Sequence, residues 1–172
     1  NGNHIRRLTT AELARRCMPF LVAAGLVSEP VDEATFRRVE GVVALEQTRI
    51  ESLQAIAEAT SYFFTPTITY AAKAERMLTQ AGTHEVLRAA RSHLAGLPDW
   101  AVTSLEQAGQ SLLADTGLAA KDAFQPARAA VTGRVASPPL FDTLHWIGRD
   151  WTLARLDLVL SGQPLPKAEA AP

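Results

Sequence analysis

Residues 9–21 read TTAELARRCMPFL, and this stretch indicates the fold class of the region around it. Thr9 and Glu12 have the S/T-x-x-E spacing of a capping box, in which side chains and backbone N–H groups pair at a helix start. The apolar residues that follow recur at helical intervals: Leu13, Cys17, Phe20 and Leu21. The stretch therefore predicts an amphipathic helix whose apolar face, including an inert Cys17, packs against a core.

The helical period continues outward along the chain. A second helix is expected after Asp32, and a third from about residue 49 to residue 64. The second helix has an expected stripe of Phe36, Val39, Val43 and Gln47. Further on, glycines and prolines separate short helices, one of which is expected at 126–132 with Pro126 in its first turn. No strand-like alternation is bounded by hairpin turns, so the sequence predicts an all-α fold.

Thr65-Pro66-Thr67 is the clearest break in this pattern, because proline disfavours helix at the residue before it. We therefore predict two small helical subdomains, residues 1–66 and residues 67–162. The remaining residues, 163–172, read QPLPKAEAAP and are predicted to form a disordered tail.

Composition excludes several classes of protein. The chain has 172 residues, of which 47% are hydrophobic and 20% charged, so it is expected to be globular and not wholly disordered. No apolar run approaches the roughly 18 residues of a spanning helix, and no leader-like segment opens the chain. Its one cysteine excludes an internal disulfide and a multi-thiolate metal site. We expect a cytoplasmic protein without a membrane role.

The sequence shows no convincing catalytic or metal site. His84 and His93 are nine residues apart and do not share a helix face. Asp142 and His145 are three apart and could meet on one helix, but a solvated surface pair explains that spacing more simply. A helical metalloenzyme is therefore the least favoured interpretation.

Arginines are the most suggestive polar residues, because the planar guanidinium suits both phosphates and base edges. Ordinary solvated or i,i+4-paired side chains are the simpler interpretation of Arg15, Arg16, Arg37, Arg38 and Arg91. For Arg49, Arg128 and Arg134, spacing alone does not decide between the two interpretations. The formal net charge of −1 neither indicates nor excludes nucleic-acid binding, since local patches create the field.

Four short motifs occur along the chain: NGNHIR at residues 1–6, QPARAAVTG at residues 125–133, SPPLF at residues 137–141 and TLARL at residues 152–156. In the same order they resemble N-G-x-[YH]-I-R, Q-P-L-R-x-A-L-T-G, [ST]-P-G-L-F and T-L-x-R-L. These four patterns belong to the C-terminal half of bacterial glutamyl-tRNA synthetases, a family of class I aminoacyl-tRNA synthetases. Their order and separations match the family over essentially the whole chain.

The resemblance implies an all-helical anticodon-binding region that binds the anticodon stem-loop of tRNA(Glu) as a monomer. It also implies that the chain is a fragment, because the family's catalytic half, with its H-I-G-H-like and K-M-S-K-S-like signatures, would precede it. The full-length enzyme would attach glutamate to tRNA(Glu) using ATP and magnesium. This fragment would contain no catalytic residue, need no cofactor or metal, and supply anticodon recognition only.

The resemblance also assigns site residues. Arg49 aligns with an arginine that reads the last anticodon base, which favours glutamate-only recognition, and a register two residues away would place Gln47 there. Arg128 aligns with an arginine set against the anticodon loop. The turn that packs around the first anticodon base aligns with Ser137, Pro138 and Leu140. Two further residues, Gln125 and Arg134, are candidates for phosphate contacts.

Three departures from the family pattern concern these contacts. Pro139 replaces a glycine, which removes an N–H and limits close backbone approach. Ala127 replaces a leucine, and Lys121-Asp122 stands where the family often has Gly-Lys, so one expected basic contact becomes acidic. The alternative function is a helical protein-interaction module derived from a synthetase, without an RNA-binding role. An initiator methionine directly before Asn1 would favour that alternative.

Overall fold

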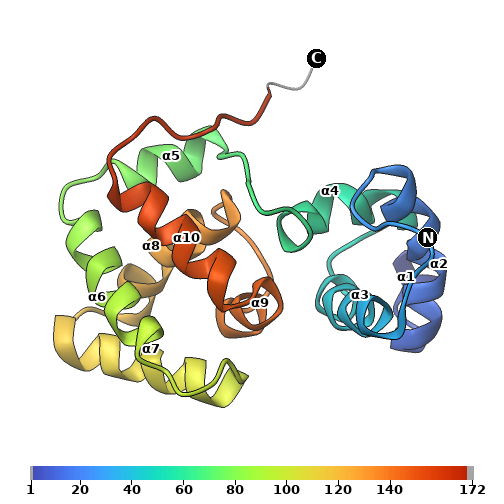
Figure 1. The fold of residues 1–172 in the computed structure, drawn as a ribbon, viewed down its shortest axis with the longest axis horizontal. Helices are drawn as coiled ribbons and strands as arrows, with labels where there is room; N and C mark the ends of the chain where they lie inside the picture. The colour runs from blue at the N-terminus through green and yellow to red at the C-terminus, as the bar shows by residue number, and fades with distance from the viewer. Residues whose placement is uncertain (1, 170–172) are drawn as a thin grey trace. The chain divides into compact units, whose positions relative to one another are not determined.

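The computed structural model describes residues 2–169, and within them the regular structure is helical apart from one isolated β-bridge (Figure 1). The predicted all-α class is therefore confirmed. The chain divides into two compact units, which meet at the Thr65–Pro66 peptide bond. No helix in the described part of the chain is long and apolar enough to cross a membrane.

The first unit contains four α-helices and two short 3-10 helices. They are α1 (Gly2–Ile5), α2 (Thr10–Ala23), α3 (Glu33–Glu46), η1 (Leu53–Ala55), α4 (Ile56–Thr60) and η2 (Ser61–Phe63). Helix α2 packs against α3 and α4, and the buried residues between them include Leu13, Cys17, Leu21, Val39, Val43 and Ile56. Burial raises the pKa of the Cys17 thiol to about 11, as expected for a core cysteine that stays protonated.

The start of α2 confirms half of the predicted capping box. The backbone N–H of Glu12 donates to the Thr9 hydroxyl at 3.2 Å. The Glu12 carboxylate instead pairs with Arg16, one turn further along, at 2.6 Å. The start of α3 uses Asp32, whose carboxylate accepts from the Thr35 N–H at 2.7 Å. Hydrogen bonding by the Thr35 side chain and by its N–H lowers the pKa of Asp32.

The region after α3 differs from the expected third helix. Helix α3 ends at Glu46, and the chain turns before η1, so that Ile50 and Ile56 both reach the same core. The buried stripe of α3 consists of Val39, Val42, Val43 and Glu46, and Gln47 lies outside it. The Gln47 amide instead donates to the carbonyls of Ile5 (3.0 Å) and Leu8 (2.8 Å), which ties α3 to the start of the chain.

The second unit is built around α8. Its helices are α5 (Ala72–Leu78), α6 (Thr83–Ala95), α7 (Val102–Thr116), α8 (Ala120–Thr132), α9 (Leu140–Ile147) and α10 (Arg149–Leu160). Helix α8 contacts each of the other five, and its buried side chains include Ala123, Ala127, Ala129 and Ala130. Alanine lets neighbouring helices approach closely, so α8 forms the centre of the unit.

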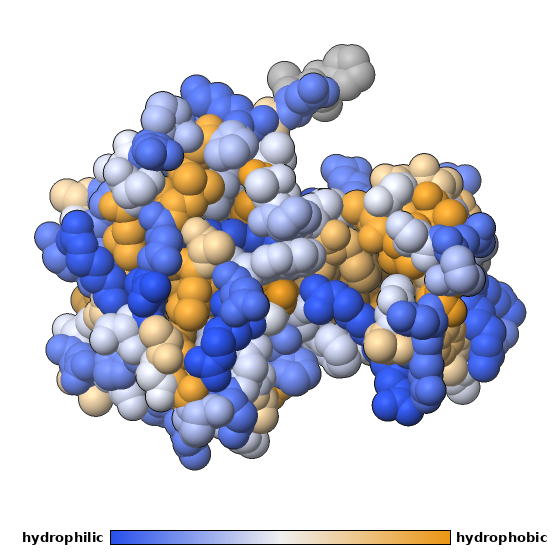
Figure 2. All heavy atoms as spheres, viewed as in Figure 1, coloured by the Kyte–Doolittle hydropathy of each residue, from blue (hydrophilic) through white to orange (hydrophobic). Residues whose placement is uncertain are grey.

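Hydrophilic side chains interrupt the apolar surface of this unit. Figure 2 shows hydrophobic patches in the region of α5, α6 and α10, broken up by hydrophilic residues. Leu118, between α7 and α8, is the exposed large hydrophobic residue of the described chain, with 37% of its surface accessible.

Pro126 lies inside α8, whereas the sequence predicted it in a first turn. The helix begins six residues earlier, at Ala120. Proline has no N–H for the Asp122 carbonyl and disfavours a helix interior by about 3 kcal/mol. Packing of α8 against all its neighbours offsets this penalty, which a periodicity argument does not include.

The C-terminal end of α8 is held by residues from distant parts of the chain. The Tyr70 hydroxyl donates to the Ala130 carbonyl at 2.8 Å, and Arg155 Nη1 donates to the Val131 carbonyl at 2.8 Å. Gly133 ends the helix with φ +72°, and its carbonyl accepts from the Ala71 N–H at 2.9 Å. These bonds satisfy carbonyls that a helix end leaves without partners.

The segment 163–169 departs from the expected disordered tail. The Tyr70 N–H donates to the Pro166 carbonyl at 2.7 Å, and the Ala168 N–H donates to the Tyr70 carbonyl at 3.1 Å. Figure 1 shows this segment running beside α5. Backbone pairing holds it, and composition alone gives no signal of such pairing. Residues 170–172 lie outside the described part of the chain.

We expect Gly133→Ala to destabilise the protein far more than Gly117→Ala. Both glycines end helices with positive φ, but a Cβ at Gly133 would lie 2.1 Å from the Thr69 carbonyl oxygen, whereas a Cβ at Gly117 meets nothing within 4 Å. A Cβ on a residue with positive φ should by itself lower the free energy of unfolding by about 1 kcal/mol at Gly117. At Gly133 the clash with the Thr69 carbonyl adds to this cost, and we expect a loss of about 3 kcal/mol. Urea unfolding of the two variants measures the difference, and equal losses would contradict the close contact.

Candidate nucleic-acid interface

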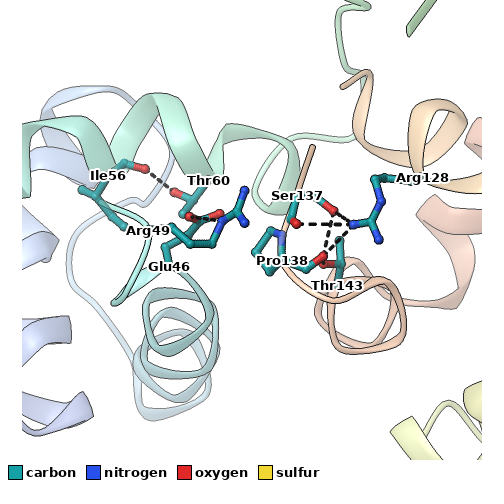
Figure 3. A network of polar contacts seen from close by, with 8 residues as sticks. All are labelled: Glu46, Arg49, Ile56, Thr60, Arg128, Ser137, Pro138 and Thr143. Carbon is teal, nitrogen blue, oxygen red and sulfur yellow. Dashed lines mark hydrogen bonds and ion pairs between the residues drawn. The ribbon is translucent and has the colours of Figure 1, made fainter. Parts of the chain in front are cut away.

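Arg49 in the first unit is exposed at the surface and pairs with a buried carboxylate, that of Glu46. It follows the end of α3, and its N–H donates to the Glu46 carbonyl at 2.8 Å. Its Nε also donates to Glu46 Oε2 at 3.2 Å, as Figure 3 shows. The Arg49 side chain is 42% exposed and that of Glu46 only 5%. One edge of the guanidinium is thus tethered while the side chain faces solvent.

Gln47 is placed differently from Arg49. It is half-buried, and its amide nitrogen is used by the carbonyls of Ile5 and Leu8. The alternative register, with Gln47 in the reading position, would require these two bonds to break. Arg49 is thus the more exposed of the two residues, and the assignment of base reading to it stays a prediction.

Arg128 in the second unit connects α8 to the loop before α9. Its Nε donates to Gln125 Oε1 at 2.8 Å, and its Nη1 donates to the Pro138 carbonyl at 2.7 Å. Nη1 also contacts the Ser137 hydroxyl and lies 3.4 Å from the Ser137 carbonyl (Figure 3). The structure thus brings four predicted site residues together, with the arginine fork holding the loop.

The loop itself is fixed at its start by Thr132. The Thr132 hydroxyl donates to the Arg128 carbonyl at 2.7 Å and accepts from the Arg134 N–H at 3.1 Å, and its oxygen also lies 3.1 Å from the Arg134 carbonyl oxygen. Arg134 is half-exposed and Pro139 is exposed. The loop therefore presents a cation and a rigid apolar ring at the surface of the second unit.

Leu140 is placed where its side chain packs inside the unit. It begins α9 and is only 6% exposed, and Pro138 is also buried. A base near this turn would thus meet the exposed Pro139 ring and the backbone at the start of α9, not the Leu140 side chain. RNA contact by Ser137, Pro138 and Leu140 stays a prediction.

Lys121 and Asp122 lie in the first turn of α8, beside a pocket of about 390 Å³. Gln125 lines the same pocket and so lies between it and Arg128. The adjacent opposite charges give this end of α8 no excess of positive charge, consistent with the departure seen in the sequence.

The remaining arginines and histidines have mostly structural partners. Arg37 and Arg91 form exposed ion pairs with Glu33 and Asp157, as predicted for ordinary surface arginines. Arg38 differs, because it is half-buried and donates to the Phe63 carbonyl at 2.5 Å.

His145 does not form the predicted pair with Asp142. Its Nδ1 lies 2.7 Å from the Trp100 carbonyl, which anchors the ring within the unit. Within residues 2–169, no three histidine, cysteine, aspartate or glutamate side chains cluster as a metal site would require.

Sequence reasoning missed three supporting residues. Glu46 could have been found from the sequence, because it is a carboxylate seven residues after Val39 and so falls on the apolar stripe of α3. Arg155 could also have been found, as a charged residue inside an apolar run. Tyr70 could not have been found, because its partner Ala130 is sixty residues away.

We expect Arg128→Lys to lower the free energy of unfolding by about 1–2 kcal/mol. Lysine cannot donate to Gln125 and to the loop carbonyls at the same time, so buried acceptors would lose their partners. Arg88→Lys, at an exposed site on α6, is the matched control and should change stability by less than about 0.5 kcal/mol. Urea unfolding measures both variants. If Arg128→Lys left the free energy of unfolding unchanged, the Arg128 hydrogen bonds would not be holding the loop.

Comparisons with known proteins agree with this arrangement. The chain is 36% identical over 158 residues to a glutamate–tRNA ligase from Moorella thermoacetica and 37% identical over 160 residues to one from Acidothermus cellulolyticus. Each alignment covers 91% of this chain and 32% of the ligase, so the chain spans about a third of the length of these relatives.

The fold is shared with a solved glutamate tRNA ligase from Elizabethkingia meningosepticum. The TM-score is 0.80 at 17% sequence identity, over 94% of this chain and 31% of that protein. A family model described as an anticodon binding domain matches residues 12–160, and the chain therefore belongs to that family.

Proposed function

We propose that this chain is the anticodon-recognition part of a glutamate–tRNA ligase and that it binds the anticodon stem-loop of tRNA(Glu). The observation that carries the proposal is the family match over residues 12–160, together with an exposed arginine fork at Arg49. The two relatives described above are glutamate–tRNA ligases, which gives the RNA its proposed identity.

Arginine chemistry supports reading of the last anticodon base by Arg49. Under the standard genetic code this base is cytosine in tRNA(Glu) and guanine in tRNA(Gln). The Watson–Crick edge of cytosine offers the acceptors O2 and N3, which suit a donor-only guanidinium. The same edge of guanine presents N–H donors from N1 and N2, which an arginine cannot satisfy. Arg49 therefore favours glutamate-only recognition.

The second unit would contribute a rigid surface for the rest of the anticodon loop. Arg128 uses its donors on Gln125, Ser137 and Pro138, so in this proposal it shapes the turn around the first anticodon base. The half-exposed Arg134 suits a phosphate, and the exposed Pro139 ring suits a stacked base. Gln125, at the rim of the α8 pocket, is the second phosphate candidate.

The remaining parts of the proposal concern the whole ligase. The other two thirds of such a protein would activate glutamate with ATP and magnesium and attach it to the tRNA. The catalytic part of the same polypeptide is then the main protein partner, and the expected setting is a monomer in the cytoplasm. This chain would supply recognition and no chemistry.

We expect the 172-residue chain to prefer a tRNA(Glu) anticodon stem-loop over the same loop with its last anticodon base changed from cytosine to guanine. Arg49→Gln should reduce this preference about tenfold, since a bidentate base contact provides roughly 1–3 kcal/mol of discrimination. Fluorescence anisotropy with labelled stem-loops, at low and moderate salt, measures the dissociation constants.

Arg37→Gln is the matched control, because Arg37 is also paired with a glutamate of α3 but is exposed on its surface. It should leave the preference unchanged. Equal, salt-sensitive binding to both loops and to an unrelated hairpin would instead indicate a generic electrostatic surface. Absence of binding to every loop at low salt would favour the alternative, a helical protein-interaction module.

A further inference from the structure

Glu46 is a carboxylate on the core-facing stripe of α3. Val39, Val42, Val43 and Glu46 follow at helical spacing, and all four are buried. A charged group in such a position loses its hydration and is tolerated only with close partners. Replacing a buried ion pair by apolar residues often stabilises a protein, so stability alone does not explain this glutamate.

The geometry of the Glu46–Arg49 pair fixes the orientation of the Arg49 guanidinium. Glu46 Oε2 accepts from Nε of Arg49 at 3.2 Å, which fixes the guanidinium by its inner edge. The Arg49 side chain remains 42% exposed, while its partner is 5% exposed (Figure 3). The exposed fork is thus oriented before any ligand arrives, and its positive charge is balanced by the carboxylate beneath it.

We infer that Glu46 is a positioning and specificity-determining residue for Arg49: it makes this arginine a hydrogen-bonding reader of a base instead of a phosphate-binding cation. The inference rests on the proposed role of Arg49 in anticodon reading. A balanced ion pair displaces no net counterion from RNA, so its contribution to binding is insensitive to salt. A pre-oriented fork also loses less side-chain freedom on binding than a free arginine.

The contrast with Arg37 supports the assignment. Arg37 and Glu33 form an i,i+4 pair on the same helix, but both side chains are largely exposed. Water screens such an exposed pair, so its hydrogen bond restrains the arginine less than a buried carboxylate does. The two pairs thus differ in their acidic members, because Glu33 is exposed whereas Glu46 is buried beneath an exposed arginine.

The test compares Glu46→Gln, Glu46→Ala and the control Glu33→Gln in the 172-residue chain. Dissociation constants are measured for the tRNA(Glu) stem-loop and for the loop with guanine as last anticodon base, over a series of salt concentrations. Glutamine keeps an acceptor for Nε but removes the charge. Glu46→Gln should therefore keep most of the discrimination, while the slope of log Kd against log salt becomes steeper by about 0.7, the value for one phosphate contact on a single strand.

Glu46→Ala removes the acceptor as well, and we expect it to reduce discrimination about tenfold. In an Arg49→Gln background, Glu46→Ala should reduce discrimination no further, since the two residues act as one unit. Glu33→Gln should change neither the discrimination nor the salt slope. Thermal unfolding of each variant identifies the folded ones, and if Glu46→Ala does not fold, the salt slope of Glu46→Gln decides.

Other outcomes overturn the inference. If Glu46→Gln and Glu46→Ala shift stability, or weaken both loops equally, with discrimination and salt slope unchanged, Glu46 is a structural residue only. That result leaves the proposed function intact, because the unaltered chain still discriminates. If the unaltered chain does not distinguish the two loops, the proposed function itself fails, and the role of Glu46 fails with it.

Discussion

A backbone contact between Gly133 and Thr69 is the constraint on which the second unit depends. Gly133 ends α8 in a left-handed conformation, and no side chain could fit between it and the Thr69 carbonyl. The contact lets the Ala71 N–H reach the Gly133 carbonyl, while Tyr70 pairs with the C-terminal segment. Three stretches far apart in the sequence thus meet at one point, the end of the central helix.

The candidate interface of this unit follows from that constraint. The loop after Gly133 begins at a fixed place, and Thr132 and Arg128 then hold it by hydrogen bonds to its backbone and to Ser137. Arg155 and Tyr70 act one step further back, by occupying the last carbonyls of α8. The QPARAAVTG and TLARL motifs therefore contain residues that support the loop as well as residues at the surface. Part of the resemblance to the family thus comes from residues that hold the fold.

The sequence predicted the helical class and the break at Pro66, because these depend on local periodicity and proline geometry. It did not predict the helix path through Pro126, where packing on all sides outweighs a local penalty. It also missed the paired C-terminal segment and the Tyr70 bond to Ala130. Those features depend on contacts between distant residues, which leave no periodic signal in a single sequence.

Arg49 and Arg128 show how one residue type serves two purposes in an anticodon binding domain. Arg128 directs its guanidinium inward and donates to polar atoms of its own unit, so it stabilises the loop before α9. Arg49 directs its fork outward, and a buried carboxylate balances its charge from below. Neither arginine behaves as a bare cation, which fits a chain with a net charge of −1. Under the proposed function, recognition of a base by Arg49 depends on hydrogen-bond geometry more than on electrostatic attraction, and geometry is what distinguishes one base from another.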